Sequence, residues 1–236
     1  MRNSTFPFLP KDFIQTKEGL IFAVVSYQDH DSKIGCFLRY VPDGDGWKKV
    51  DTQQANDLLQ QSFPHYLYHS SKVDAAFHAV SLEDIVHHHQ PELRLKELLQ
   101  REPSDEIEKK CHKLIPVLQQ FGVQIEKLGL TGSMLINQQK STSDIDLVVY
   151  GRQNFQQTRL AIQQAITSGL IDKLDISLMQ DNFERRNGEL GFEEFSWHEE
   201  RKFNKAAIEN CKFDIGMVCL EDEHDPDPHH YQKLGP

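Results

Sequence analysis

Two aspartates separated by a single residue, Asp144 and Asp146, alternate with the apolar residues Ile145, Leu147 and Val149. This period of two is typical of a β-strand, and it places both carboxylates on the same face. Ionised carboxylates about 7 Å apart along a strand repel each other unless water or a cation screens them. Because carboxylate oxygens are ligands that Mg²⁺ prefers, the pair predicts a divalent metal site.

A glycine-serine pair, Gly132 and Ser133, precedes the aspartates and follows the apolar residues Leu128 and Leu130. The leucines predict a second strand that ends at the pair, and a short helix is expected over residues 134–137. Glycine lets a phosphate approach the backbone closely, and free amide groups at the start of a helix bind anions. The pair is therefore a candidate phosphate-binding turn.

A third carboxylate is expected from a later strand. Residues 212–219 carry apolar side chains at every second position, which leaves Asp214 on the opposite face. If this strand lies beside the Asp144 strand, all three aspartates share one metal site. Asp175, in the segment 173–178, competes for the same role. We favour Asp214 because its strand is longer and alternates better.

The order of these elements resembles the signature of the DNA polymerase β-like nucleotidyltransferase superfamily. In that family a Gly-Ser turn, here Gly132-Ser133, precedes an acidic-hydrophobic-acidic strand, here Asp144-Ile145-Asp146, and a third acidic residue follows on a later strand. The resemblance covers about residues 104–220. It implies an α+β fold with a nucleotidyltransferase-type mixed β-sheet flanked by helices.

The resemblance also implies an activity, the transfer of a nucleoside monophosphate from a nucleoside triphosphate such as ATP to an acceptor hydroxyl by two-metal catalysis. Asp144 and Asp146 would hold both Mg²⁺ ions, which Mn²⁺ can replace, and Asp214 would hold the acceptor-side ion and take the acceptor's proton. Gly132 and Ser133 would bind the β- and γ-phosphates. A catalytically silent nucleotide-binding module, or an antitoxin-like partner module of the same fold, is the alternative that stays open.

A cationic side chain is also expected to contact the triphosphate. Many relatives carry an arginine or lysine shortly after the Gly-Ser pair, but residues 135–137 of this chain are Leu, Ile and Asn. The candidates are therefore Lys140, Arg201, Lys202 and Lys205. The last three belong to the segment 172–205, which mixes aromatic and basic residues. That mixture fits a clamp for a base and its phosphates, and equally core anchors among surface charges.

Composition and pattern divide the chain into an N-terminal α+β domain (1–103), a nucleotidyltransferase domain (104–220) and an acidic tail (221–236) that is expected to be poorly ordered. In the first domain, the β-branched runs 19–27 and 34–41 predict a hairpin. Helices are expected over 51–61 and over 85–100, with an interruption at Pro91. On such a helix, His87, His88 and His89 would point in different directions, so a solvated surface is favoured over a metal site.

The chain has a net charge of −10, which opposes tight binding to long nucleic acids. The acceptor is therefore expected to be a small molecule, a protein or at most a nucleic-acid end. We find no apolar run long enough to cross a bilayer and no secretory signal, so no membrane partner and a cytoplasmic location are expected. The four cysteines are widely spaced, which predicts reduced thiols. The aromatic residues of the N-terminal domain leave room for a homo-oligomer interface.

Overall fold

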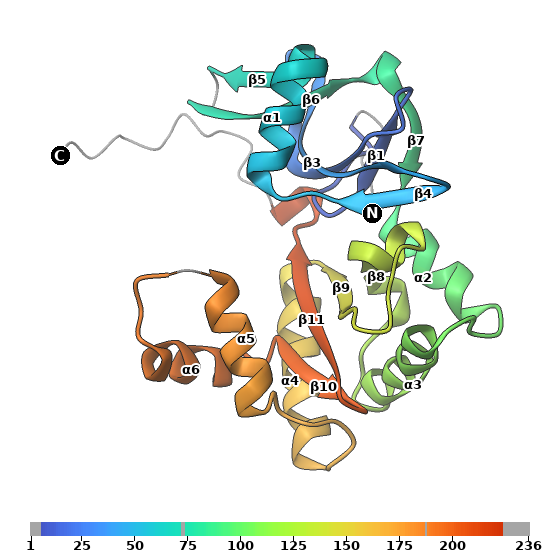
Figure 1. Cartoon of the computed structure of the whole chain (residues 1–236). Coiled ribbons are helices and arrows are strands. Elements are labelled where there is room, and N and C mark those ends of the chain that lie inside the picture. Colours follow the sequence, from blue (N-terminus) through green and yellow to red (C-terminus); the bar gives the residue numbers. More distant parts are fainter. Residues whose placement is uncertain (1–5, 72–73, 187, 224–236) are drawn as a thin grey trace.

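The computed structural model describes residues 6–71, 74–186 and 188–223, which form two β-sheets with helices around them (Figure 1). The fold is α+β, with a helix-flanked mixed sheet in the C-terminal part and a separate N-terminal sheet, as predicted. Residues 224–236 of the predicted acidic tail lie outside the described part, and its first residues form the turn η5 (Glu221–Glu223). None of the helices in the described ranges combines the length and apolarity needed to span a membrane.

The N-terminal sheet contains β1 (Phe13–Thr16), β2 (Ile21–His30), β3 (Lys33–Asp43), β4 (Gly46–Lys49), β5 (Leu67–Ser70), β6 (Ala75–Ser81) and β7 (Ile85–His89). Its order is β5-β6-β3-β2-β1-β7, β4 pairs with β3, and all neighbours are antiparallel. The predicted hairpin is confirmed as β2 and β3. The connections also contain the short turns η1 (Pro64–Tyr66) and η2 (Leu82–Asp84).

The helix α1 (Thr52–Ser62) begins where the sequence predicts, because Asp51 caps it. The Asp51 carboxylate accepts a hydrogen bond from the backbone N–H of Gln54, and the Gln54 side chain accepts one from the N–H of Asp51. Ala55 and Leu59 then pack α1 into the core of the N-terminal sheet. The apolar spacing and the cap thus agree on one helix.

The prediction of a helix over 85–100 is wrong in its first part, because Ile85–His89 is the strand β7, which pairs with β1. The following helix, α2 (Pro91–Leu99), begins only at the proline. The strand separates the three histidines by face. His88 is hydrogen-bonded to the buried carboxylate of Asp12 at 2.8 Å, whereas the rings of His87 and His89 lie together with centroids 4.2 Å apart.

The C-terminal sheet contains β8 (Leu128–Thr131), β9 (Ile145–Tyr150), β10 (Lys205–Ile208) and β11 (Cys211–Val218). Its order is β10-β11-β9-β8; β11 and β9 are parallel and the other pairs are antiparallel, so the sheet is mixed. Around it lie α3 (Glu106–Gln120), α4 (Arg152–Thr167), α5 (Ile176–Arg186) and α6 (Phe192–Glu200), with the turns η3 (Ile125–Lys127) and η4 (Gly132–Ile136).

Helices cover one face of this sheet. Ile145, Leu147 and Val149 of β9 share a core with residues of α2, α3 and α4, and Figure 1 shows α4 behind β10 and β11. The helix α2, which we expected in the N-terminal domain, contributes the buried Leu95 and Leu98 to this core. The packing therefore groups α2 with the C-terminal sheet.

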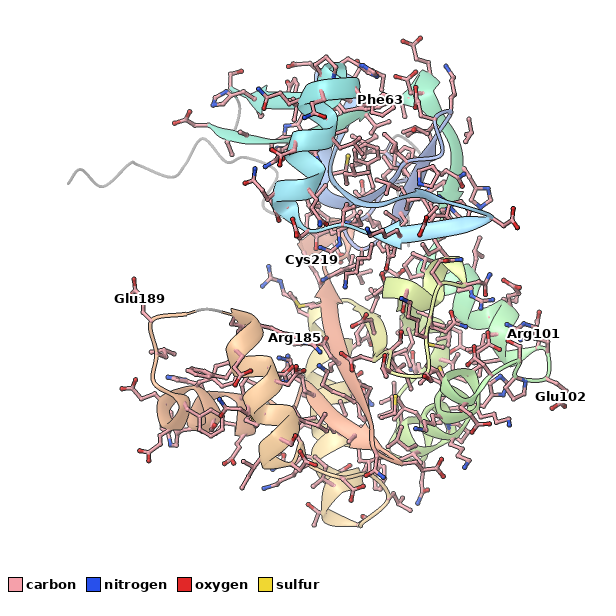
Figure 2. The ribbon with its side chains drawn as sticks, viewed as in Figure 1. Phe63, Arg101, Glu102, Arg185, Glu189 and Cys219 are labelled. Carbon is pink, nitrogen blue, oxygen red and sulfur yellow. The ribbon has the colours of Figure 1, made fainter. Side chains whose placement is uncertain are left out.

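The N-terminal unit covers the opposite face. The Thr131 hydroxyl donates a hydrogen bond to the carbonyl oxygen of Lys11 at 2.8 Å. The backbone N–H of Cys219, which Figure 2 shows at the junction of the two units, donates to the Tyr27 hydroxyl at 2.9 Å. Val148 and Val218 pack with Tyr27 in a small cluster. The polar face of the C-terminal sheet is thus enclosed between the two units.

Candidate active site

Asp146 and Asp214 lie side by side on neighbouring strands. The parallel pairing of β9 and β11 places Asp214 directly opposite Asp146, on the face that points away from α2, α3 and α4. The prediction that the Asp214 strand lies next to the Asp144 strand is confirmed. The competing residue, Asp175, instead accepts a hydrogen bond from the N–H of Leu178 at 2.7 Å, at the start of α5.

The surroundings make both carboxylates costly to ionise. Burial raises the pKa of Asp146 to about 6, and the negative charges of Asp214 and Asp144 add to the effect, whereas Lys11 and Lys49 oppose it. Burial likewise raises the pKa of Asp214, although Lys205 and Lys11 counteract it. A bound cation would relieve this repulsion directly.

Gly132 forms the turn that passes over Asp146. Thr131 is paired with Asp146 across β8 and β9, and Gly132 follows with a φ of +66°, in the left-handed region that favours glycine. A Cβ atom at this position would collide with the Asp146 carboxylate, lying 3.0 Å from its Cγ atom. A residue with a side chain therefore cannot occupy position 132 without displacing the aspartate.

The rest of this turn is held in place by buried side chains of α2 and α3. The segment predicted as a short helix is the 3₁₀ turn η4, in which Ser133 remains partly exposed and Met134 is buried. The Met134 carbonyl accepts a hydrogen bond from the buried Arg94 guanidinium at 2.9 Å. Arg94 in turn is paired with the fully buried Glu108 at 3.1 Å. The candidate phosphate-binding turn is thus attached to α2 and α3.

Asp144 is already neutralised by a lysine. The ammonium of Lys212 lies 2.7 Å from the Asp144 carboxylate and donates a hydrogen bond to the side-chain oxygen of Asn182 at 3.0 Å. Arg185 approaches the same carboxylate at 3.8 Å. We did not identify Lys212, Asn182 or Arg185 as site residues from the sequence. A signal for Lys212 was present, because a residue two positions before Asp214 on a strand shares its face.

The four cations proposed from the sequence lie in different surroundings. Lys205 is opposite Asp214 on β10, but its ammonium is 2.8 Å from Glu199, and that of Lys202 is 2.6 Å from the same carboxylate. The Arg201 guanidinium lies 3.2 Å from the centre of the Trp197 ring. Lys140 is exposed in the turn before β9. Of the four, Lys205 is the one whose charge acts on Asp214.

The aromatic residues of this segment pack mainly on each other. The Phe183 ring on α5 contacts the rings of Phe192 and Phe195 on α6, each with centroids 5.5 Å apart. Phe195 is buried. These contacts fit the interpretation of the phenylalanines as core anchors that join the two helices.

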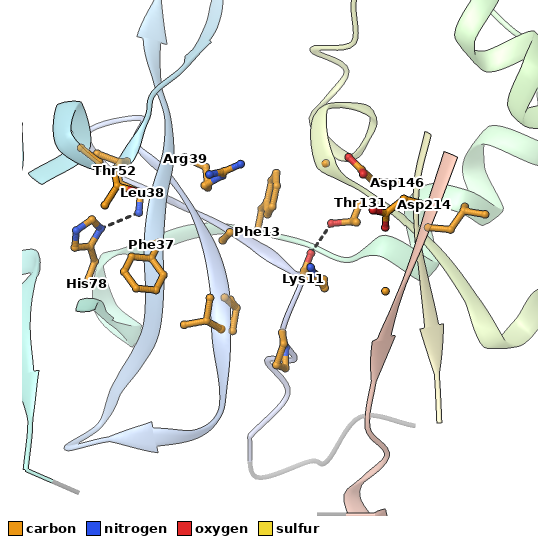
Figure 3. Close-up of a pocket in the computed structure, with 18 residues that line it drawn as sticks. Lys11, Phe13, Phe37, Leu38, Arg39, Thr52, His78, Thr131, Asp146 and Asp214 are labelled. Carbon is orange, nitrogen blue, oxygen red and sulfur yellow. Dashed lines mark hydrogen bonds between the residues drawn. The ribbon is translucent and has the colours of Figure 1, made fainter. Parts of the chain in front are cut away.

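A cavity of about 700 Å³ lies between the two units, and Figure 3 shows its lining. Thr131, Gly132, Asp146 and Asp214 form part of one side. The opposite side belongs to the N-terminal unit, whose lining residues include Lys11, Phe13, Val24, Phe37, Arg39 and His78. The candidate site is therefore shared by residues far apart in the sequence.

The donor atoms suit a hard divalent cation, but they are not gathered around one point. Across the described ranges, no three His, Cys, Asp or Glu side chains are arranged closely enough to hold a metal ion. Asp146 and Asp214 are neighbours, while Asp144 is turned to Lys212. The carboxylate oxygens are of the kind that Mg²⁺ prefers, but Asp144 would have to leave Lys212 for all three aspartates to share a metal site.

Comparison with known proteins supports the same family. Residues 112–187 match the model of the family described as "Polymerase beta, Nucleotidyltransferase". The matched range includes the Gly132 turn, Asp144 and Asp146, but not Asp214. The chain is also 32% identical over 243 residues to the "Uncharacterized protein MJ1086" of Methanocaldococcus jannaschii, an alignment that covers 90% of this chain and 68% of that protein. No solved structure matches the chain.

Proposed function

This chain belongs to the DNA polymerase β-like nucleotidyltransferase superfamily, and from that premise we propose that it is a metal-dependent nucleotidyltransferase. It moves a nucleoside monophosphate from a nucleoside triphosphate to an acceptor hydroxyl. One observation carries the proposal: Asp146 lies under the Gly132 turn, and Asp214 lies in register with Asp146 on a parallel neighbouring strand.

The reaction requires an acceptor oxygen to attack the α-phosphorus while pyrophosphate leaves, so negative charge develops on both oxygens. Asp144, Asp146 and Asp214 are the residues that would hold Mg²⁺ or Mn²⁺. When bound, two such ions neutralise the charge that develops on the attacking and leaving oxygens. The backbone amides of Gly132 and Ser133, with the Ser133 hydroxyl, bind the β- and γ-phosphates.

The protein residues also handle the proton of the acceptor. Asp214 lines the cavity with Asp146 and is therefore placed to face an acceptor hydroxyl bound there. We assign the acceptor's proton to Asp214. Lys11 lies over Gly216 on the same strand, with its Cε atom 3.4 Å from the position of a Cβ atom there, and it limits the negative charge of the site.

One observation favours the alternative function, a silent nucleotide-binding or antitoxin-like module. The ion pair between Lys212 and Asp144 occupies a carboxylate that the metal ions require. In a silent module this pair persists when nucleotide binds. In an enzyme, Asp144 would leave Lys212 and serve as a metal ligand.

The proposal is tested by incubating the protein with each α-labelled nucleoside triphosphate and Mg²⁺ or Mn²⁺ in a cell extract. We expect one macromolecule or metabolite to acquire the label, and the labelled species identifies the acceptor. Asp146→Asn and Asp214→Asn should reduce labelling to background. Asp45→Asn, in an exposed turn, is the control and should label normally.

Two results would contradict the enzyme. Labelling that persists in both active-site variants would remove these aspartates from the mechanism. Binding of the nucleotide and metal without transfer to any component of the extract would support the silent module instead.

A further inference from the structure

Two cations of the N-terminal unit, Arg39 and Lys49, lie near the candidate site. Arg39, on β3, lines the cavity across from Asp146 and Asp214, as Figure 3 shows. Lys49 is the last residue of β4, whose strand pairs with β3. Within the part of the chain that the structure describes, neither side chain makes a hydrogen bond or an ion pair. Cationic groups at a cavity of this size require an explanation.

The strand β4 is docked on the candidate phosphate-binding turn. Trp47 and Tyr40 pack against Leu135 and Ile136 of η4. The backbone N–H of Trp47 donates to the side-chain oxygen of Gln138 at 3.3 Å, which attaches β4 to the residues that follow the turn. Because alternate residues of a strand share a face, Trp47 and Lys49 project from the same side of β4. The docking therefore fixes Lys49 beside η4.

Electrostatic interactions connect these groups with one another and with the aspartates. Partial desolvation and the nearby Arg39 lower the pKa of Lys49, while Asp146 and Asp144 raise it. The charge of Lys49 in turn lowers the pKa of Asp146. Two cations that repel each other beside a phosphate-binding turn are stabilised by a ligand with several negative charges.

Three other cations near the site are already paired with carboxylates. Lys202 and Lys205 are both paired with Glu199, and Lys212 is paired with Asp144. The turn η4 carries no basic residue of its own. The N-terminal unit thus supplies the positive charge that the Gly-Ser segment of this chain lacks.

We infer that Arg39 and Lys49 bind the β- and γ-phosphates of the nucleoside triphosphate, so that the N-terminal unit completes the nucleotide site of the C-terminal sheet. This inference rests on the proposed function, because it takes the phosphate seat at Gly132 as given. It assigns the N-terminal unit a direct role in substrate binding.

The test measures dissociation constants for the Mg²⁺ complexes of ATP, GTP, CTP and UTP, and for the monophosphate of whichever nucleoside binds. Lys49→Gln and Arg39→Gln should each weaken triphosphate binding by about tenfold or more, because each removes a charged hydrogen-bond donor. Monophosphate binding should change by less than about twofold, since that ligand lacks the two outer phosphates. Lys49→Arg should restore most of the triphosphate affinity.

Lys48→Gln is the matched control, because it removes the same charge from the neighbouring exposed position of β4. It should bind every nucleotide as the wild type does. Equal affinities of the wild type, Lys49→Gln and Arg39→Gln for the triphosphate would overturn this inference and leave the proposed enzyme intact. An equal loss for triphosphate and monophosphate would also overturn it. A wild-type protein that binds none of the four triphosphates would refute both proposals.

Discussion

Asp146 combines several conflicting demands in one residue. Its carboxylate lies under the Gly132 turn, beside Asp214, and it is partly buried. These surroundings raise its pKa to about 6, which makes the ionised form costly in the unliganded protein. Functional sites often retain such unfavourable charges because ligand binding neutralises them.

We expect Asp146→Asn to raise the free energy of unfolding at pH 7 by about 1 to 3 kcal/mol. Between the ordinary value of 3.8 and about 6, the native protein holds a proton that the unfolded chain has lost. The stability of the wild type therefore falls as pH rises through this window, and the advantage of the variant appears over the same window. Urea unfolding at pH 4, 5, 6 and 7 measures it. A variant that is less stable than the wild type at pH 7 would contradict this account.

Gly132 is a second residue whose type is fixed by a single contact. We expect Gly132→Ala to abolish nucleotide transfer and to lower the free energy of unfolding by about 1 to 3 kcal/mol, because the methyl group meets Asp146 and φ is positive. Gly188→Ala is the control, since a Cβ atom there has no neighbour within 4 Å. Thermal unfolding and the labelling assay compare the two. Normal transfer by Gly132→Ala would show that the turn is not the phosphate seat.

At the level of elements, a buried ionic network connects the turn η4 with α2 and α3. The Glu108 carboxylate on α3 is fully buried and contacts Arg94, Arg101 and Ser104. Burial alone would raise its pKa, but the hydrogen bonds from Arg101 and Ser104 outweigh burial and hold the pKa at about 2. Arg94 carries the connection onward to the Met134 carbonyl. The position of the turn thus depends on this network.

Glu108→Gln should lower the free energy of unfolding by about 3 to 5 kcal/mol, because it leaves the buried Arg94 paired only with the exposed Glu97. Glu106→Gln, at the exposed position two residues earlier on α3, should change it by less than about 0.5 kcal/mol. Denaturant unfolding measures both variants. A small effect of Glu108→Gln would mean that the network is not needed for stability.

We also expect the free energy of unfolding to decrease in acid because of the Glu108 carboxylate. Its pKa is lower in the native state than the ordinary value of 4.5, so its contribution is complete above about pH 4.5 and is lost as pH falls toward 2. The loss should amount to about 3 kcal/mol. Glu108→Gln should show a correspondingly weaker decline over this range.

The accuracy of the predicted elements depended on how much local signal each contained. The helix α1 has both a cap and an apolar stripe, and it was placed within one residue. The histidines of β7 show no clear apolar period. The helical pattern that begins at Pro91 was therefore extended too far toward the N-terminus, over these residues. Only the pairing with β1 makes this segment a strand, and that contact joins residues far apart in the sequence, such as Phe13 and His89.

For the molecule as a whole, the N-terminal unit and the C-terminal sheet enclose one cavity. The helix α2 connects them in the chain, yet its Leu95 and Leu98 are buried in the C-terminal core. Gly129 on β8 allows this packing, because a Cβ atom there would lie 2.7 Å from the Cβ atom of Pro91. The folding unit of the C-terminal sheet therefore includes α2.

Two fragments test this unit. We expect residues 91–223 to unfold cooperatively and residues 104–223 to lose cooperativity, because removing two buried leucines costs about 4 to 10 kcal/mol. Circular dichroism during urea unfolding distinguishes them. Both fragments lack Arg39 and Lys49, so neither should bind a triphosphate as tightly as the full chain. Equal stability of the two fragments would place the boundary after α2 instead.

The sequence by itself determined the face on which Asp146 and Asp214 lie and the turn at Gly132, because strand period and glycine conformation are local properties. It also indicated the family, through motifs that lie within some fifteen residues of one another. The tertiary structure alone decided that Lys212 neutralises Asp144 and that Arg39 and Lys49 of the first sheet lie at the site of the second. These contacts depend on how two sheets pack, and a periodic pattern specifies which face is buried without specifying which distant surface covers it.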